Sequence, residues 1–394
     1  MNNELADRQQ AIKLRLAGKS VVEICNILGR SHDWFHTWWR RYRALGPNGL
    51  FELTRTNAQP RRITPDLERS ILNIRRRLVS QTHPGTRYSL IGAGSILAEL
   101  QILHIRPLPS LRTIERVLER NGITTPKVRL APYLSRATYP KPEANASNQL
   151  HQVDGVGPIY LKGNRQRYYI FVCKDVYDGS VCLRIYRSRK MEVILDFLGE
   201  CWKSLGLPAQ VQFDNAREVV GWGPAAKYLS RVLRLCLRFG VEPLLIPPGR
   251  PQRNGSVENF NGWFQSRLFQ RHYSQIGALK RELHRLEETV NTQHVQPRLS
   301  GLTPAQYRRR TKLRKLPSNY LIPHEPFPVA AGRITFFRQV TKHGNVHLLS
   351  QTFFVGKRLK GEYVKVLLDT KRAHLTVYRH GHIFKRFPFP FLKR

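Results

Sequence analysis

Residues 209–214 read Ala-Gln-Val-Gln-Phe-Asp, a short apolar run with a strand pattern that ends on an acid. Leu150–Asp154, which reads Leu-His-Gln-Val-Asp, has the same form. Between these two segments, Arg167–Lys174 and Ser180–Ser188 are rich in Tyr, Ile, Val and Phe, and they predict two further strands. The turn residues Asp178-Gly179 favour an antiparallel meander of the first three strands.

Helical patterns separate the later strands of this region. They predict helices at Lys190–Leu205 and Ala225–Phe239, a strand near Glu242–Ile246, and helices that begin near Gly255 and at Ile276. The resulting order is three strands, a helix, a strand, a helix, a strand and a helix. This is the element order of the ribonuclease-H-like fold, and it predicts an α/β domain over residues 148–296.

The charge of the chain indicates a polyanionic partner. Its 394 residues include 66 Lys and Arg but only 27 Asp and Glu, which gives a formal net charge of +39. DNA or RNA is therefore the first candidate partner, and an anionic membrane surface is the second. The sequence shows no apolar run of about 18 residues and no signal-peptide pattern at Met1–Leu28, so we expect a soluble intracellular protein.

Cysteine usage fits the same expectation. Five cysteines with wide spacing each have apolar neighbours, and we expect reduced core thiols in a cytosol-like compartment. They are Cys25, Cys173, Cys182, Cys201 and Cys236. His32 and His36 have a spacing found in zinc sites, but no cysteine pair precedes them, so a zinc site is not expected.

The first 58 residues predict a helix-turn-helix domain. Helical spacing covers Asp7–Ala17, Ser20 is a candidate N-cap for Val21–Leu28, and Ser31 caps a third helix at His32–Leu45. A short second helix, a tight turn and a basic third helix are the geometry that places a recognition helix in a major groove. Its candidate DNA contacts are Arg40, Arg41 and Arg43. The alternative is a plain three-helix bundle with solvated arginines.

A second helix-turn-helix-like domain is predicted over residues 59–125. Its helices are expected at Thr64–Leu78, Ser89–Leu100 and Ser110–Asn121, and Arg112 and Arg116 on the last are candidate DNA contacts. Residues 126–147 then form a basic, proline-containing linker that could lie along a DNA backbone or be a solvated connector.

Three acids stand out in this basic chain. Asp154 and Asp214 end strands that are neighbours in the expected sheet, and Glu258 lies in the first turn of the helix that begins near Gly255. A carboxylate beside DNA is repulsive unless a cation lies between them. Three converging carboxylates make a hard-oxygen site suited to Mg²⁺ or Mn²⁺, and two such ions can serve phosphoryl transfer. The alternatives are turn residues for Asp154 and Asp214 and a helix-dipole partner for Glu258.

Three blocks resemble the signature blocks of the retroviral-integrase-like DDE core. They are His151-Gln152-Val153-Asp154, Phe213-Asp214-Asn215, and Pro251-Gln252-Arg253-Asn254-Gly255 leading to Glu258. Leu302–Tyr307 resembles the stretch after that core in bacterial insertion-sequence transposases. The resemblance covers residues 148–310 well and residues 1–125 more loosely. One departure is the interval from Asp214 to Glu258, which exceeds the family's commonest spacing; an insert around Gly221–Pro224 could account for it.

The resemblance implies a DNA transposase or integrase that binds transposon-end inverted repeats, cleaves 3′ ends and joins them to target DNA. It implies two Mg²⁺ or Mn²⁺ ions per site and a dimer or tetramer on double-stranded DNA, in a bacterial cytoplasm at the nucleoid. Three rivals remain: an inactive DNA-binding regulator, a ribonuclease-H-like nuclease such as a junction resolvase, and a nucleic-acid-packaging protein.

Further residues are assigned by position. Lys227, Arg231, Gln252, Arg253 and Asn254 are candidate DNA contacts on the helix and loop before Glu258, with solvated surface as the alternative for the first two. Asp175 and Asp178 precede Gly179 and are expected to serve the hairpin turn rather than a metal. Residues 297–326 are expected to form a basic connector. Alternating short segments in residues 327–394 predict a small closed or half-closed β-barrel for DNA binding or assembly.

Overall fold

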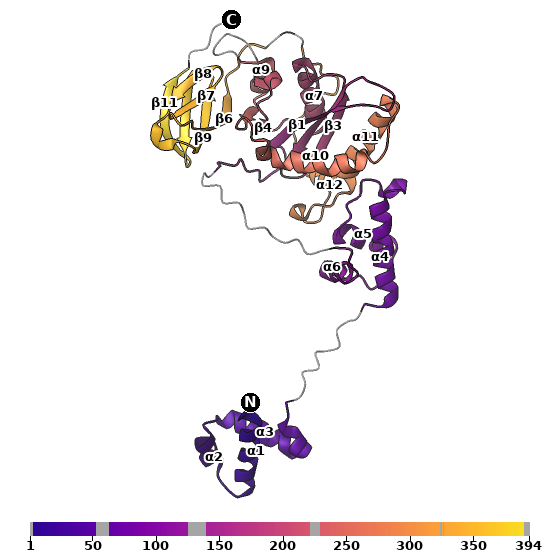
Figure 1. Ribbon diagram of the computed structural model, residues 1–394, viewed down its shortest axis with the longest axis vertical. Helices are drawn as coiled ribbons and strands as arrows, with labels where there is room; N and C mark the ends of the chain where they lie inside the picture. The colour runs from indigo at the N-terminus through magenta and orange to yellow at the C-terminus, as the bar shows by residue number, and fades with distance from the viewer. Residues whose placement is uncertain are drawn as a thin grey trace. The chain divides into compact units, whose positions relative to one another are not determined.

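The computed structural model describes residues 3–52, 63–124, 139–220, 229–323, 325 and 327–389. The chain divides into two compact units, Met1–Thr64 and Pro65–Arg394 (Figure 1). Nowhere in the described ranges is a helix both long and apolar enough to cross a membrane. All five cysteines are buried and free of disulfides.

The first unit is a three-helix domain. Its elements are α1 (Asn3–Leu16), α2 (Val21–Leu28), α3 (His32–Leu45) and the 3-10 turn η1 (Gly46–Leu50). The Ser20 side chain accepts a hydrogen bond from the Glu23 N–H while the Glu23 carboxylate accepts one from the Ser20 N–H, so α2 begins with a capping box. Gly29 then adopts a left-handed conformation and ends the helix. The predicted bounds of α2 and α3 are confirmed.

The second unit opens with three more helices. They are α4 (Pro65–Ser80), α5 (Ala93–Ile102) and α6 (Leu111–Arg120), with the 3-10 turn η2 (Pro84–Thr86) between the first two. The segment between α4 and α5 contacts the α/β core. Arg87 Nη1 and Tyr88 Oη donate hydrogen bonds of 2.7 and 2.8 Å to the Glu282 carboxylate, and the His294 ring lies 2.8 Å from the Tyr88 carbonyl oxygen.

The α/β core has the predicted order of strands, with two differences in its helices. A short helix at Arg217–Val220 follows the fourth strand, and the helix expected at Ala225–Phe239 begins at Arg231, where Ser230 caps it. Its strands are β1 (Leu150–Ile159), β2 (Tyr168–Asp175), β3 (Val181–Tyr186), β4 (Gln210–Phe213) and β5 (Glu242–Leu245). β2 pairs antiparallel with β1 and β3, while β4 runs parallel to β1 and to β5. The expectation that the strands leading to Asp154 and Asp214 are neighbours is therefore confirmed.

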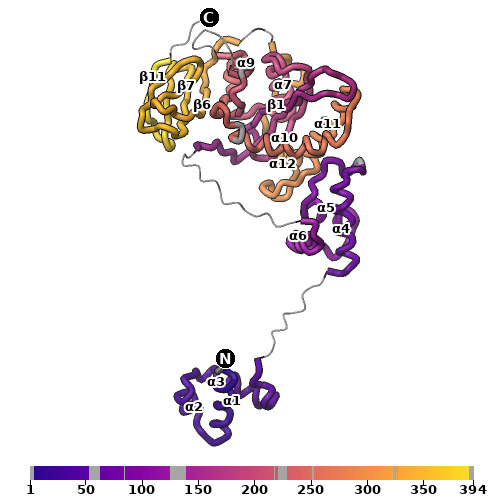
Figure 2. Tube along the Cα trace, in the orientation of Figure 1, coloured from indigo at the N-terminus to yellow at the C-terminus, as the bar shows by residue number. Residues whose placement is uncertain are grey.

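Helices cover both faces of this sheet. They are α7 (Met191–Ser204), α8 (Arg217–Val220), α9 (Arg231–Arg238), α10 (Gly255–Leu268), α11 (Ile276–Gln293) and α12 (Pro304–Arg309), with the 3-10 turns η3 (Pro251–Asn254) and η4 (Pro297–Leu299). One core cluster joins α7 and α9 to the sheet, and a second joins α10 and α11 to its other face. α10 lies close to β1, which matters for the position of Glu258 (Figure 2).

The C-terminal strands extend the core sheet. They are β6 (Arg333–Gln339), β7 (Asn345–Leu348), β8 (Gln351–Phe354), β9 (Tyr363–Asp369), β10 (His374–Arg379) and β11 (His382–Pro388), with the 3-10 turn η5 (Lys357–Leu359). β6 pairs parallel with β5, which gives a nine-stranded sheet in the order β11-β10-β9-β6-β5-β4-β1-β2-β3, and β7 and β8 form a separate hairpin. The predicted small β-barrel is not confirmed, because alternation fixes only which face of a strand is buried and not which strand lies beside it.

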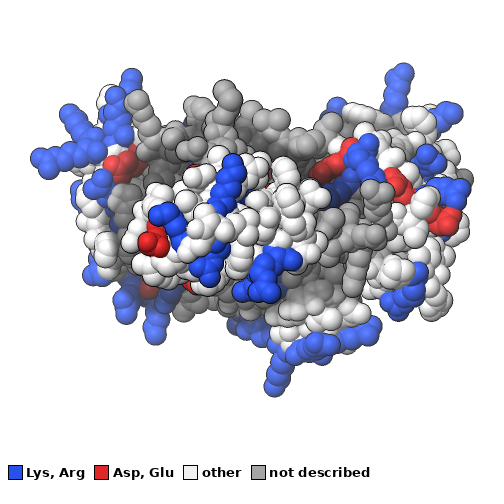
Figure 3. Space-filling view, turned by 90° about the horizontal axis from the view of Figure 1, so that it is seen from below, with Lys and Arg blue, Asp and Glu red and all other residues white. Residues whose placement is uncertain are grey.

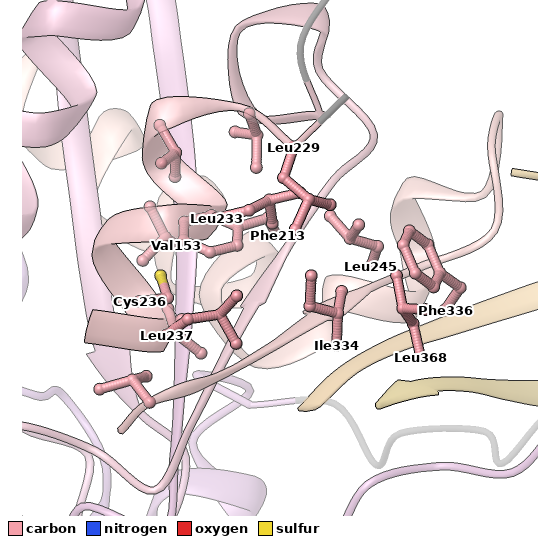
Figure 4. Packing of buried hydrophobic residues seen from close by; sticks show 14 of the residues in the cluster. Val153, Phe213, Leu229, Leu233, Cys236, Leu237, Leu245, Ile334, Phe336 and Leu368 are labelled. Carbon is pink, nitrogen blue, oxygen red and sulfur yellow. The ribbon is translucent and has the colours of Figure 1, made fainter. Parts of the chain in front are cut away.

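One apolar cluster runs through this junction. Ile334 and Phe336 of β6 and Leu368 of β9 belong to the same buried cluster as Phe213 and Leu245 of the α/β core (Figure 4). The C-terminal strands and the core therefore share one hydrophobic interior.

Candidate active site

Asp154 and Asp214 lie side by side where β4 ends. The prediction that Asp154 ends its strand is wrong, because β1 stays paired with β2 past Asp154 and continues to Ile159. The parallel strands β1 and β4 pair Gln152 with Gln212, so each aspartate follows its glutamine by two residues in the same direction. Both line a small cavity of about 80 Å³, together with Arg189 and other residues of the surrounding loops. The strand register thus places these two acids together, as the sequence predicts.

Few donors stabilise the ionised forms of these acids. Asp154 Oδ1 accepts a hydrogen bond of 2.9 Å from the Gly155 N–H, and its Oδ2 accepts one of 2.7 Å from Asn261 Nδ2. Asp214 Oδ1 accepts one of 3.1 Å from the Ala216 N–H. Burial raises the pKa of Asp154, and the negative charge of Asp214 raises it further. Asp214 is exposed to solvent on one side, and partial burial of its carboxylate raises its pKa as well.

Glu258 is the fourth residue of α10, and a strand side chain fixes where that helix begins. Gln152 Oε1 accepts hydrogen bonds from the N–H groups of Ser256 and Val257, at 3.0 and 3.1 Å. These are groups that the first turn of a helix cannot satisfy by itself. Burial raises the pKa of Glu258, and the negative charge of Asp154 raises it further. Partial burial therefore raises the pKa of all three acids, and the charge of another member of the trio raises it further for Asp154 and Glu258.

The chemistry of these donors fits a hard divalent cation. Carboxylate oxygens suit Mg²⁺ or Mn²⁺, and raised pKa values in a strongly basic chain are what uncompensated carboxylates display. Within the described ranges, however, no group of three or more His, Cys, Asp or Glu side chains is close enough to hold a metal ion. The ligand roles of Asp154, Asp214 and Glu258 therefore stay predictions.

Asn254 has a different place from the one that its sequence position suggests. Its side chain is buried, its Nδ2 donates to the Val153 carbonyl oxygen at 3.1 Å, and its Oδ1 accepts from Gln212 Nε2 at 3.1 Å. With both amide groups engaged inside the protein, Asn254 fixes the loop before α10 and is not offered to DNA.

Gln152 and Gln212 were not identified from the sequence, although a signal was available. Each is a polar residue two positions before one of the two aspartates, at a buried strand position that an apolar residue usually occupies. Both are buried, and both hold the loop and helix that carry Glu258.

The other predicted DNA contacts of the core, Arg253, Arg231, Gln252 and Lys227, differ in their surroundings. The Arg253 guanidinium lies 4.2 Å from the Tyr139 ring centroid and 5.3 Å from that of Tyr363. Arg231 Nη1 lies 3.3 Å from Glu192 and its side chain is largely buried. The Gln252 side chain and the whole of Lys227 lie outside the described residues.

A C-terminal arginine reaches the loop that carries Asp214. Arg338 of β6 is buried, its Nη2 donates to Asn215 Oδ1 at 2.9 Å, and its Nη1 donates to the Ile246 carbonyl oxygen at 3.3 Å. Asn215 Nδ2 also donates to that carbonyl oxygen. Burial lowers the pKa of Arg338 to about 10. Nothing in the local sequence pattern links β6 to this loop, since the link depends on the pairing of β5 with β6.

Asp175 and Asp178 serve structure, as the sequence predicts. Both are fully buried, and Arg308 of α12 donates to each of them, at 2.8 Å from Nη2 and 2.7 Å from Nε. Asp175 also accepts from the N–H groups of Tyr177 and Asn148.

The candidate DNA contacts of the helical regions differ in availability. Arg40 and Arg43 are exposed on α3, whereas Arg41 stacks 4.3 Å from the Trp38 ring and donates to the Phe51 carbonyl oxygen. On α6, Arg116 is exposed and Arg112 pairs with Glu115 and Glu119. On the face shown in Figure 3, Lys and Arg side chains are spread widely and Asp and Glu side chains are few.

Comparison with known proteins adds a family match for the first unit. Residues 2–51 match the model of the homeodomain-like domain. No curated protein matches the chain. The predicted helix-turn-helix is therefore supported by both its geometry and this match.

Three solved retroviral integrase structures are similar to the chain at low identity. The HTLV-2 integrase catalytic core in complex with magnesium is 18% identical with a TM-score of 0.32, and the match covers 41% of this chain and 96% of that one. The simian T-cell lymphotropic virus intasome in complex with PP2A regulatory subunit B56 gamma is 16% identical with a TM-score of 0.35, over 76% and 95% of the two chains. The BIV integrase catalytic core is 17% identical with a TM-score of 0.31, over 42% and 96%.

Proposed function

We propose that the protein is a DNA transposase or integrase of the DDE class, with Asp154, Asp214 and Glu258 as its catalytic acids. One observation carries the proposal. In a chain of net charge +39, Asp154 of β1 and Asp214 at the end of β4 lie together, and Gln152 of β1 caps the helix that carries Glu258.

The chain's own residues would hold DNA and orient the site. The exposed arginines of α3 would contact transposon-end DNA, because a recognition helix contacts the major groove through its exposed face. Asn261 orients the Asp154 carboxylate, while Asn254 and Gln212 keep the loop before α10 against β1. Mg²⁺ or Mn²⁺ ions, held by the three acids, would supply the activation of the attacking oxygen and the stabilisation of the leaving one. A dimer or tetramer on two DNA ends belongs to the same proposal.

The test is a joining assay with transposon-end duplexes and a target plasmid, with and without Mg²⁺ or Mn²⁺. We expect Asp214→Asn to lower joining by at least about a thousandfold, since losing several kcal/mol of transition-state stabilisation costs about tenfold per 1.4 kcal/mol. Duplex binding by the variant should equal that of the wild type. Asp66→Asn is the matched control, because Asp66 is exposed on α4 and pairs only with the exposed Arg69 among described residues.

The rival functions give different results in the same assay. Metal-dependent cleavage without joined products would indicate a ribonuclease-H-like nuclease. Duplex binding without cleavage or joining, under every metal tried, would indicate a DNA-binding regulator. Full joining by Asp214→Asn would contradict the assignment of the acids.

A further inference from the structure

The C-terminal sheet has an open groove on the face away from the shared core. The groove has a volume of about 750 Å³ and is lined by β6, β9, β10, β11 and Pro140. Alternation along β9 defines its floor: Val364, Val366 and Leu368 are buried, while the alternate residues Tyr363, Lys365 and Leu367 keep part of their surface exposed and line the groove. This face of the sheet is therefore open to a binding partner.

The charges of this groove select an anion. Four of the residues that line it are cationic, and within the described ranges no carboxylate forms an ion pair with any of them. They are Arg333, Lys365, Arg372 and Arg386. Two histidines, His374 and His380, also line the groove, and Asp369 is the single acid among the described lining residues. An extended anion such as a phosphate backbone matches this arrangement.

Aromatic rings on the floor narrow the choice further. Tyr363 and Tyr378 are half-buried in the groove, and the Lys365 ammonium lies 5.9 Å from the Tyr378 ring centroid. Bases within a duplex are stacked on each other and show only their edges, whereas an unpaired base has a free face to lay on an aromatic side chain. We propose that this groove binds a single-stranded DNA segment, with phosphates on its arginines and bases on its tyrosines.

A row of side chains joins the groove to the candidate active site. Tyr363 forms an edge contact with Tyr139, at 5.6 Å between centroids, and both rings contact Arg253. Arg253 precedes Asn254, and the Asn254 side-chain amide donates a hydrogen bond to the carbonyl oxygen of Val153, the residue before Asp154. A strand in the groove would therefore lead past Arg253 towards the start of α10. The inference uses the proposed function only for the source of the strand, which is DNA opened at a cleaved end.

Binding of a labelled oligothymidylate to the full chain tests the proposal, in EDTA so that catalysis plays no part. Arg372→Gln with Arg386→Gln should lower single-strand affinity about tenfold. The pair should also reduce the slope of log affinity against log salt by about 1.4, because each neutralised phosphate of a single strand contributes about 0.7 to that slope. Lys357→Gln with Arg358→Gln is the matched control, since both residues are exposed on η5 outside the groove and the charge change is equal.

Stacking is tested separately on Tyr378. Tyr378→Leu should weaken binding of the single strand by about ten- to a hundredfold. Tyr378→Phe, which keeps the aromatic ring, should bind it as the wild type does. Neither substitution should alter binding of an abasic strand of the same length. Duplex binding through the first unit should stay unchanged in every groove variant. An unchanged midpoint of thermal denaturation for the second unit shows that the groove variants are folded.

Three results would overturn the inference: unchanged single-strand affinity in the groove variants, equal losses for groove and control pairs, or equal losses for single strands and duplexes. Failure of the proposed function is distinguishable, because Asp214→Asn leaves the groove intact and should bind the oligothymidylate as the wild type does.

Discussion

Two pairs of aspartates in the same sheet differ in what surrounds them. Asp175 and Asp178 are buried and receive hydrogen bonds from Arg308 and from backbone N–H groups. Burial alone would raise the pKa of Asp175, but the hydrogen bond and charge of His151 and the charge of Arg308 hold it below its usual value. Asp154 and Asp214 have few donors, and burial raises the pKa of each.

The comparison shows that the donors around a carboxylate, rather than its residue type, decide its role. A satisfied buried acid stabilises the fold and has no capacity left for a ligand. A partly buried acid with few donors, such as Asp154, is costly to the fold, and such groups cluster where a ligand or reaction compensates the cost.

The largest expected effect comes from removing the donor to the satisfied pair. Arg308→Met removes the cation beside Asp178 and one of the two cations beside Asp175, since His151 remains, and we expect it to lower the free energy of unfolding by about 3–5 kcal/mol. Urea denaturation followed by tryptophan fluorescence measures this change. Arg309→Met is the control on the same helix, because Arg309 is exposed, and its effect should stay within about 0.5 kcal/mol. Equal effects of the two substitutions would remove the distinction between the pairs.

A divalent cation should act on the other pair. We expect Mg²⁺ at ten times its dissociation constant to stabilise the wild type by about 1.4 kcal/mol, because a ligand that binds only the folded state adds its binding free energy. Asp154→Asn with Asp214→Asn should lose this stabilisation, while Arg309→Met should keep it. Thermal denaturation with and without Mg²⁺, at constant ionic strength, makes the measurement. A similar shift in the double variant would indicate that the cation binds elsewhere.

The smallest effect concerns pH in the absence of metal. Asp175 has a lowered folded pKa, so its stabilisation is present above its unfolded pKa of about 3.9 and is lost as the pH falls through its folded value. Asp154 and Asp214 have raised folded pKa values, so ionising them disfavours the fold, and their cost disappears as the pH falls to about 4.

The double variant Asp154→Asn with Asp214→Asn measures the free-energy cost of ionising these two aspartates in the folded protein. It should be more stable than the wild type at pH 7 by less than about 1 kcal/mol after screening by solvent, and the two proteins should converge near pH 4. Chemical denaturation at several pH values gives the difference directly. A difference that grows on acidification would contradict the raised pKa values.

The sequence was sufficient for features that depend on local patterns. The caps at Ser20 and Ser31 and the glycine at position 29 fix α2 and α3, and the predicted ranges agree with the structure. Apolar runs that end on Asp154 and Asp214 likewise predicted adjacent strands, because element order in such a sheet leaves few pairings.

Features that depend on long-range pairing were not predictable in the same way. A barrel and an extended sheet require the same alternation, so residues 327–394 did not reveal that β6 lies beside β5. The burial of Asn254 and the reach of Arg338 follow from such pairings. Each polar side chain found its partners about 100 residues away in the chain, between Asn254 and Val153 and between Arg338 and Ile246.

The parallel contact between β5 and β6 has a practical consequence for anyone who shortens this protein. A fragment that ends before Arg333 would leave the backbone N–H and carbonyl groups of β5 without their neighbour, next to the side chains of Leu244 and Leu245. Bare, apolar strand edges recruit other chains and precipitate. A fragment trimmed to residues 148–296 should therefore aggregate, whereas one that retains the chain through Phe389 keeps the β5 edge covered.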